Sequence, residues 1–228
     1  MMLPGTGSDE TFVRSVFDIP LAAVGIRTVA PAPVPGPALA SSALAAVSSS
    51  ATEPVLVGGI SFGAHLAAEW AVRNPARCAG LVLALPAWHG SPGSAPASLS
   101  ARLSASQVRS LGVAGALAAA EMPPWLADEL GRAWRGYGGG LADSLEVAAS
   151  RAAPTFAELE TLDVPVGIAA CADDPIHPAG EAREWAAALP RAAVCSTRLA
   201  VVGTDPEALG RAAVLAWLRA GGRPGGVE

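Results

Sequence analysis

Short apolar runs alternate with longer segments of helical periodicity along the chain. The runs have the length and bounding residues of buried strands, and they cover residues 1–3, 26–30, 54–58, 80–85, 164–170 and 193–199. Apolar residues recur at helical spacing in residues 9–24, 62–74, 179–189 and 206–220. This alternation predicts an α/β fold with a mostly parallel sheet of about six strands and helices on both faces.

Residues 91–151 depart from this rhythm. They contain no strand signal, and their helix-like pieces are broken at Gly112, at Pro123-Pro124 and at residues 138–140. We therefore predict a helical insertion within a single domain that spans residues 1–228. An insertion at the carboxyl edge of a parallel sheet lies where such sheets bind ligands, which suggests a lid. The alternative is a helical layer that only buries this edge.

The composition fits one globular domain with a sizeable core. Of the 228 residues, 51% are hydrophobic and 15% are charged. The longest apolar tract, residues 21–47, is broken by four prolines, so we expect no transmembrane helix and no membrane partner. The first ten residues lack the basic and apolar regions of a secretory signal, and the expected location is therefore the cytoplasm.

Charge and cysteine content narrow the function classes. The net charge is -5 and the 15 cationic residues, all arginines, are scattered, which argues against a nucleic-acid partner. Cys78, Cys171 and Cys195 are spaced neither for a metal site nor for a disulfide framework, so we expect ordinary buried thiols. The sequence contains no phosphate loop, dinucleotide fingerprint or metal-ligand motif, so we expect no cofactor and no metal. It carries no signal for an oligomeric state.

One motif carries chemistry. Residues 59–63, Gly-Ile-Ser-Phe-Gly, match the G-x-S-x-G turn in which a strained serine joins a strand to a helix. The context agrees, because a strand-like run precedes Ser61 and a helical pattern follows it. The amino terminus of that helix would direct N–H groups toward an oxyanion. The motif predicts Ser61 as a nucleophile; the alternative is a helix-capping serine.

From this motif outward, nearly the whole chain resembles the α/β-hydrolase superfamily. Residues 3–9, Leu-Pro-Gly-Thr-Gly-Ser-Asp, look like the loop that usually reads His-Gly-x-x-Gly and donates the second oxyanion N–H. By position that donor is Thr6, paired with Phe62 directly after the serine. The resemblance implies an α/β-hydrolase fold, in which this chain begins at the third of the usual eight strands.

A second segment is similar to the superfamily's acid loop, usually written G-x-x-D-P-x-x-P. Residues 167–178 read Gly-Ile-Ala-Ala-Cys-Ala-Asp-Asp-Pro-Ile-His-Pro, and aligning the two prolines makes Asp174 the acid. A carboxylate here would orient an imidazole and stabilise its charged form. The alternative is a simple turn, which Asp-Asp-Pro also favours.

The histidine of the superfamily's triad is missing from its usual place. That place, a Gly-His after the last strand, corresponds to Gly203-Thr204, and threonine cannot act as a base near neutral pH. His65 follows Ser61 by one helical turn and is expected to pack against the sheet. His89 and His177 follow strands at the carboxyl edge and are candidate substitute bases, but we expect that no base has been relocated.

The expected function follows from these residues. Trp88, Trp125 and Trp134 are placed to line a pocket for a small apolar ester-like molecule, or else they are core residues of the helical layer. We expect a serine hydrolase, of carboxylesterase or thioesterase type, with an impaired or relocated base and no cofactor. The alternatives are a catalytically degenerate protein that binds a small apolar ligand or a partner, and a lyase or cyclase on the same scaffold.

Overall fold

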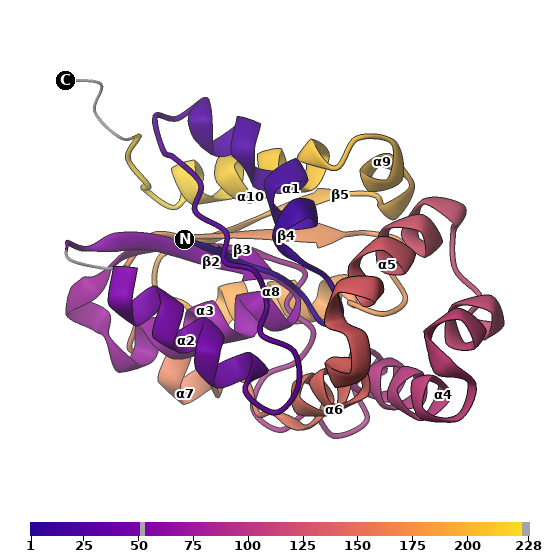
Figure 1. Cartoon of the computed structure of the whole chain (residues 1–228). Helices are drawn as coiled ribbons and strands as arrows, with labels where there is room; N and C mark the ends of the chain where they lie inside the picture. Colours follow the sequence, from indigo (N-terminus) through magenta and orange to yellow (C-terminus); the bar gives the residue numbers. More distant parts are fainter. Residues whose placement is uncertain (51–52, 225–228) are drawn as a thin grey trace.

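The computed structural model describes residues 1–50 and 53–224, and its centre is a parallel sheet (Figure 1). The described sheet has five strands in the order β1-β2-β3-β4-β5. The strands are β1 (Met2–Leu3), β2 (Val55–Ile60), β3 (Cys78–Ala84), β4 (Val166–Cys171) and β5 (Ala192–Thr197). Every neighbouring pair is parallel, as the alternation of strand and helix patterns predicts. The α/β fold class is therefore confirmed.

Helices cover both faces of the sheet. One face carries α2 (Leu39–Ser50), α3 (Phe62–Arg73), α7 (Phe156–Leu159) and α8 (Ala179–Ala188), and the other carries α1 (Glu10–Ala22), α9 (Leu199–Thr204) and α10 (Glu207–Arg219) (Figure 1). Along β3, Leu81 and Leu83 belong to the core on the side of α3 and α8. Val82 and Ala84 belong to the core on the side of α1 and α10. Because successive side chains point to opposite faces, a strand that is buried on both sides must be apolar throughout.

The sixth predicted strand is not formed. Residues 26–30 run beside β1, where the Met2 N–H donates to the Val29 carbonyl oxygen over 2.8 Å, but they are not part of the sheet. The reason is the length of β1, since a strand of two residues supports only a very short ladder on either side. The prediction of about six strands is corrected to five described ones.

The insertion is helical and breaks where the sequence indicates. It consists of α4 (Pro96–Ala119), α5 (Pro124–Tyr137), the 3-10 turn η2 (Gly138–Gly140) and α6 (Leu141–Ser150), gathered at one end of the sheet (Figure 1). Gly112 has φ +71° and kinks α4, and Gly138 has φ +52° where α5 ends. Both angles lie in the region that glycine adopts most readily. Among the described helices, none has the length and hydropathy needed to span a bilayer.

Candidate active site

Ser61 occupies a strained turn between β2 and α3. Its φ of +52° and ψ of -115° lie outside the regions that residues with a Cβ normally adopt. The Ser61 N–H donates to the Ala84 carbonyl oxygen over 2.8 Å, which ties the turn to the end of β3. The side chain is thus held at the carboxyl edge of the sheet, with the residue 9% exposed.

The glycines of the motif allow a close backbone approach. A Cβ at Gly63 would lie 2.3 Å from the Leu3 carbonyl oxygen, and one at Gly59 would lie 2.5 Å from the same atom. No real Cβ comes so near to a backbone atom, so any side chain here would displace β1. The loop after β1 is equally close, because a Cβ at Gly5 would lie 3.5 Å from the Ser61 Cβ. The glycines therefore let the segment around Thr6 lie beside the serine.

His177 lies between Ser61 and Asp174. Its Nε2 is 2.9 Å from the Ser61 Oγ, and its Nδ1 is 2.9 Å from the Asp174 Oδ2. Asp174 Oδ1 accepts the N–H groups of Ile176 and His177 over 2.8 and 3.1 Å. We expected that no other histidine would lie beside the serine, and this expectation is wrong. The loop after β4 folds back on the Asp174 carboxylate and brings the His177 ring to Ser61. The signal in the sequence was a histidine three residues after Asp174.

The environment of Asp174 keeps it charged. Burial alone would raise its pKa, but the bonds from His177 and from the two backbone N–H groups outweigh burial and lower it. An ionised carboxylate only accepts hydrogen bonds, so the His177 Nδ1 carries a proton. In the neutral ring the Nε2 is then a free acceptor for the Ser61 hydroxyl.

The other two histidines do not reach the serine. His65 is 3% exposed and packs between Trp88 and Trp185, and its Nε2 accepts the Ala87 N–H over 3.0 Å. Burial, with a smaller contribution from His177, lowers the pKa of His65 to about 3. It is the structural residue that we expected. His89 is stacked on a phenylalanine at 3.8 Å, with Nδ1 3.4 Å from a carboxylate of α8, so its described contacts lie outside the serine site.

Thr204 is the last residue of α9 and is exposed. Its hydroxyl donates to the Val201 carbonyl oxygen over 3.0 Å, which satisfies it within its own helix. The position that corresponds to the usual catalytic histidine therefore closes a short helix and takes no part in the cluster around Ser61.

Two backbone N–H groups beside Ser61 are available to a ligand oxygen. Phe62 opens α3, and the first N–H groups of a helix have no partner within it. In the described part of the chain, neither the Phe62 nor the Thr6 N–H donates to another protein group. The Thr6 loop and the start of α3 thus supply two candidate donors near the serine.

Two of the three tryptophans that we placed at a pocket are core residues. Trp88 and Trp134 are 4% and 3% exposed and belong to the core, as the alternative expected. Trp125 packs against Gly203 of α9. An apolar cavity of about 110 Å³ lies elsewhere, between α2, α3, the loop after β1 and residues 31–34, and Gly5 and Phe62 are among its lining residues.

Two of the three cysteines, Cys78 and Cys171, are the buried thiols that we expected, whereas Cys195 is only partly buried. Burial raises the pKa of Cys78 to about 11 and that of Cys171 to about 12, which keeps both as neutral thiols. Among the described residues, His89, Glu181 and Glu184 hold ligand-type atoms within 4.8 Å of one another. Two of these residues are partly buried and Glu184 is exposed, so the group is as compatible with a solvated surface as with a metal.

Three solved structures with a similar fold are each at most 21% identical to this chain. A thermophilic esterase from Thermogutta terrifontis has a TM-score of 0.70 and 20% identity, covering 96% of this chain and 88% of that one. A hydrolase from Pseudomonas aeruginosa PA01 has a TM-score of 0.65 and 21% identity, covering 95% and 89%. The enol-lactonase from Burkholderia xenovorans LB400 has a TM-score of 0.58 and 18% identity, covering 83% and 79%. No family model matches the sequence, and no curated protein matches it. The likeness shows the α/β-hydrolase fold.

Proposed function

We propose that the protein is a serine hydrolase that cleaves a carboxylic ester or a thioester, with Ser61 as nucleophile, His177 as base and Asp174 as the acid that orients it. The observation that carries this proposal is the pair of 2.9 Å contacts that joins Ser61 Oγ through the imidazole to Asp174. These distances are within the reach required of a nucleophile and its base. The similar folds of an esterase and an enol-lactonase support the reaction class.

The acylation step follows from this geometry. As the Ser61 oxygen attacks the carbonyl carbon, its proton passes to His177 Nε2, and the ring charge is balanced by Asp174. The carbonyl oxygen becomes an oxyanion, which the N–H groups of Thr6 and Phe62 stabilise. When the carbon–oxygen or carbon–sulfur bond breaks, His177 returns the proton to the leaving alcohol or thiol, and the acyl group remains on Ser61.

Deacylation reuses the same groups. His177 takes a proton from water, the hydroxide oxygen attacks the acyl carbon, and the bond to Ser61 breaks as the serine recovers its proton. The carboxylic acid leaves and the enzyme is restored. The relocated histidine supplies a base for both halves, so a stalled acyl-enzyme is not expected from the substitution at Thr204.

The test is hydrolysis of p-nitrophenyl butyrate by the wild type, Ser61→Ala and His177→Gln. Removing a serine or histidine from such a triad lowers kcat by up to about 10⁶-fold, so both variants should be nearly inactive. His89→Gln and Thr204→Ala are matched controls. The first changes a histidine that lies away from the serine, and the second changes the position where the superfamily usually has its histidine. Both should keep the wild-type rate.

Labelling identifies the nucleophile directly. A fluorophosphonate probe should add one adduct to the wild type, detected by intact mass and mapped to Ser61, and none to Ser61→Ala. If the wild type and Ser61→Ala instead show equal, negligible turnover and no adduct forms, the site is not hydrolytic, and a binding function or a lyase or cyclase function replaces the proposal.

A further inference from the structure

The loop that carries the Thr6 N–H has little support from the sheet. It leaves β1, which is only two residues long and pairs through Met2 and Leu3 with Gly58 and Gly59 of β2. Within the loop, one backbone bond is formed, from the Ser8 N–H to the Gly5 carbonyl oxygen over 3.1 Å. A donor that must be fixed to be effective therefore needs contacts from another element.

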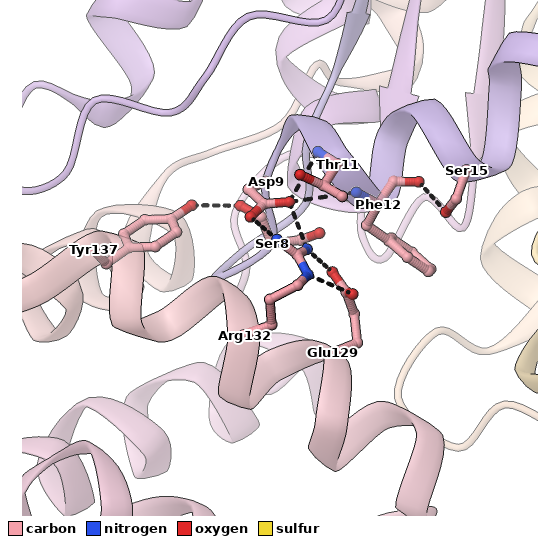
Figure 2. A network of polar contacts seen from close by, with 8 residues as sticks. All are labelled: Ser8, Asp9, Thr11, Phe12, Ser15, Glu129, Arg132 and Tyr137. Carbon is pink, nitrogen blue, oxygen red and sulfur yellow. Dashed lines mark hydrogen bonds and ion pairs between the residues drawn. The ribbon is translucent and has the colours of Figure 1, made fainter.

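Helix α5 of the insertion makes those contacts with the three residues directly after Thr6. Trp134 closes on Gly7, where a Cβ would lie 2.6 Å from the indole Nε1. The Tyr137 hydroxyl donates to the Ser8 carbonyl oxygen over 2.7 Å (Figure 2). Arg132 donates to both carboxylate oxygens of Asp9 over 2.6 and 2.7 Å. The contacts come from one helix and converge on one short segment.

Asp9 links this helix to the start of α1. Its Oδ1 also accepts the N–H groups of Thr11 and Phe12 over 2.9 and 3.3 Å, as an N-cap does. Figure 2 shows the guanidinium of Arg132 held between Asp9 and Glu129. A two-point arginine–carboxylate contact fixes orientation as well as distance.

The pair is partly removed from water. The side chains of Asp9 and Arg132 are 15% and 37% exposed. Burial opposes the charge on Asp9, but the bonds from Arg132 and from the backbone outweigh burial and lower its pKa. A partly buried two-point ion pair fixes its two side chains more firmly than exposed surface pairs, which contribute little to stability.

We propose that Arg132 and Tyr137 are positioning residues, through which helix α5 holds the Thr6 N–H where the oxyanion forms. This inference rests on the proposed function and gives the insertion a role in the chemistry. Because the oxyanion exists only in the transition state and the intermediates that resemble it, a displaced donor lowers kcat and leaves KM nearly unchanged.

The experiment compares Arg132→Gln and Tyr137→Phe with Arg109→Gln. Arg109 is a matched control, since it also bridges two carboxylates, Asp143 and Glu146, inside the insertion but has no described contact with the loop. Tyr137→Phe removes a single hydroxyl and serves if Arg132→Gln does not fold. Thermal midpoints verify that each variant is folded.

Three readouts are taken on each variant. Steady-state hydrolysis of p-nitrophenyl butyrate gives kcat and KM, and inhibition by a trifluoromethyl ketone reports the oxyanion position. Amide hydrogen exchange of residues 3–9 reports loop motion without any turnover. Arg132→Gln should lower kcat by about 10 to 100-fold, weaken the ketone by a similar factor and speed the exchange. Tyr137→Phe should shift all three in the same direction by less, and Arg109→Gln should shift none.

The outcomes separate this inference from the proposed function. If Arg132→Gln and Tyr137→Phe match Arg109→Gln in kinetics and inhibition, the positioning role is refuted, whether or not exchange changes. If the wild type lacks Ser61-dependent turnover, the proposed function fails and the positioning of an oxyanion donor fails with it. The exchange rates then still decide whether α5 holds the loop.

Discussion

Acid should destabilise this protein partly through one buried imidazole, and the substitution His65→Gln tests this. His65 is 3% exposed, and its Nε2 accepts the Ala87 N–H, so the folded protein holds the ring neutral. Glutamine can offer an oxygen to the same N–H but does not titrate near neutral pH. The variant therefore removes the protonation equilibrium while it preserves an acceptor.

The size of the effect follows from linkage. The pKa of His65 is lowered from 6.5 to about 3 by burial, so the unfolded chain binds a proton that the folded one rejects between these values. Stability is complete above pH 6.5 and is lost as the pH falls toward 3, at about 1.4 kcal/mol per pH unit. At pH 5 the loss amounts to about 2 kcal/mol.

Urea unfolding at pH 7.5 and pH 5.0 measures this loss. Carboxylates contribute equally to both proteins, so the comparison isolates His65. Whatever the substitution costs at pH 7.5, the stability advantage of the wild type over His65→Gln should shrink by about 2 kcal/mol at pH 5.0. An advantage that is the same at both pH values would refute the reasoning and mean that the ring can be protonated without unfolding.

Two further substitutions test packing and charge. Gly63→Ala places a Cβ 2.3 Å from the Leu3 carbonyl oxygen and should lower the free energy of unfolding by about 1 to 3 kcal/mol or more. The control Gly136→Ala, in open space within α5, should raise it by up to about 1 kcal/mol. Similar urea midpoints for the two variants would contradict the close approach at Gly63. Arg151→Met removes two hydrogen bonds, of 2.7 and 2.9 Å, from the buried carboxylate of Glu69. The cost in unfolding free energy should stay at about 1 to 3 kcal/mol, because Arg73 still pairs with that carboxylate. An unchanged thermal midpoint would show that the Arg151 contact adds nothing.

The sequence predicted the features that local patterns encode. The strand and helix alternation, the strained Ser61 turn and the breaks at Gly112 and Gly138 each depend on a few neighbouring residues, and the structure has all of them. The prediction for residues 26–30 failed for a reason beyond local pattern: an apolar run becomes a strand only if its neighbour is long enough to pair with it, and β1 is not.

The contacts of helix α5 were out of reach for a different reason. Arg132 and Asp9 are 123 residues apart in the sequence, and neither belongs to a motif. A charged residue on an amphipathic helix is ordinarily solvated, so nothing local marks this arginine as different from Arg109. Only the fold, which brings the insertion against the loop after β1, distinguishes the two.

The sequence named His177 only as one of two candidate bases, because the superfamily's usual histidine position lies after the last strand and was given more weight than the loop after β4. The order of serine, acid and histidine along the chain is the one usual in this fold, but His177 follows Asp174 by three residues and precedes β5. One carboxylate does two things here: its Oδ1 binds the N–H groups of residues 176 and 177, and its Oδ2 binds the ring. Because Oδ1 shapes the turn and Oδ2 of the same carboxylate orients the imidazole, a short loop is enough to form the turn and to place the ring. Since ordering a few residues costs little chain entropy, this arrangement frees the segment after β5, which forms α9 and ends at an exposed Thr204.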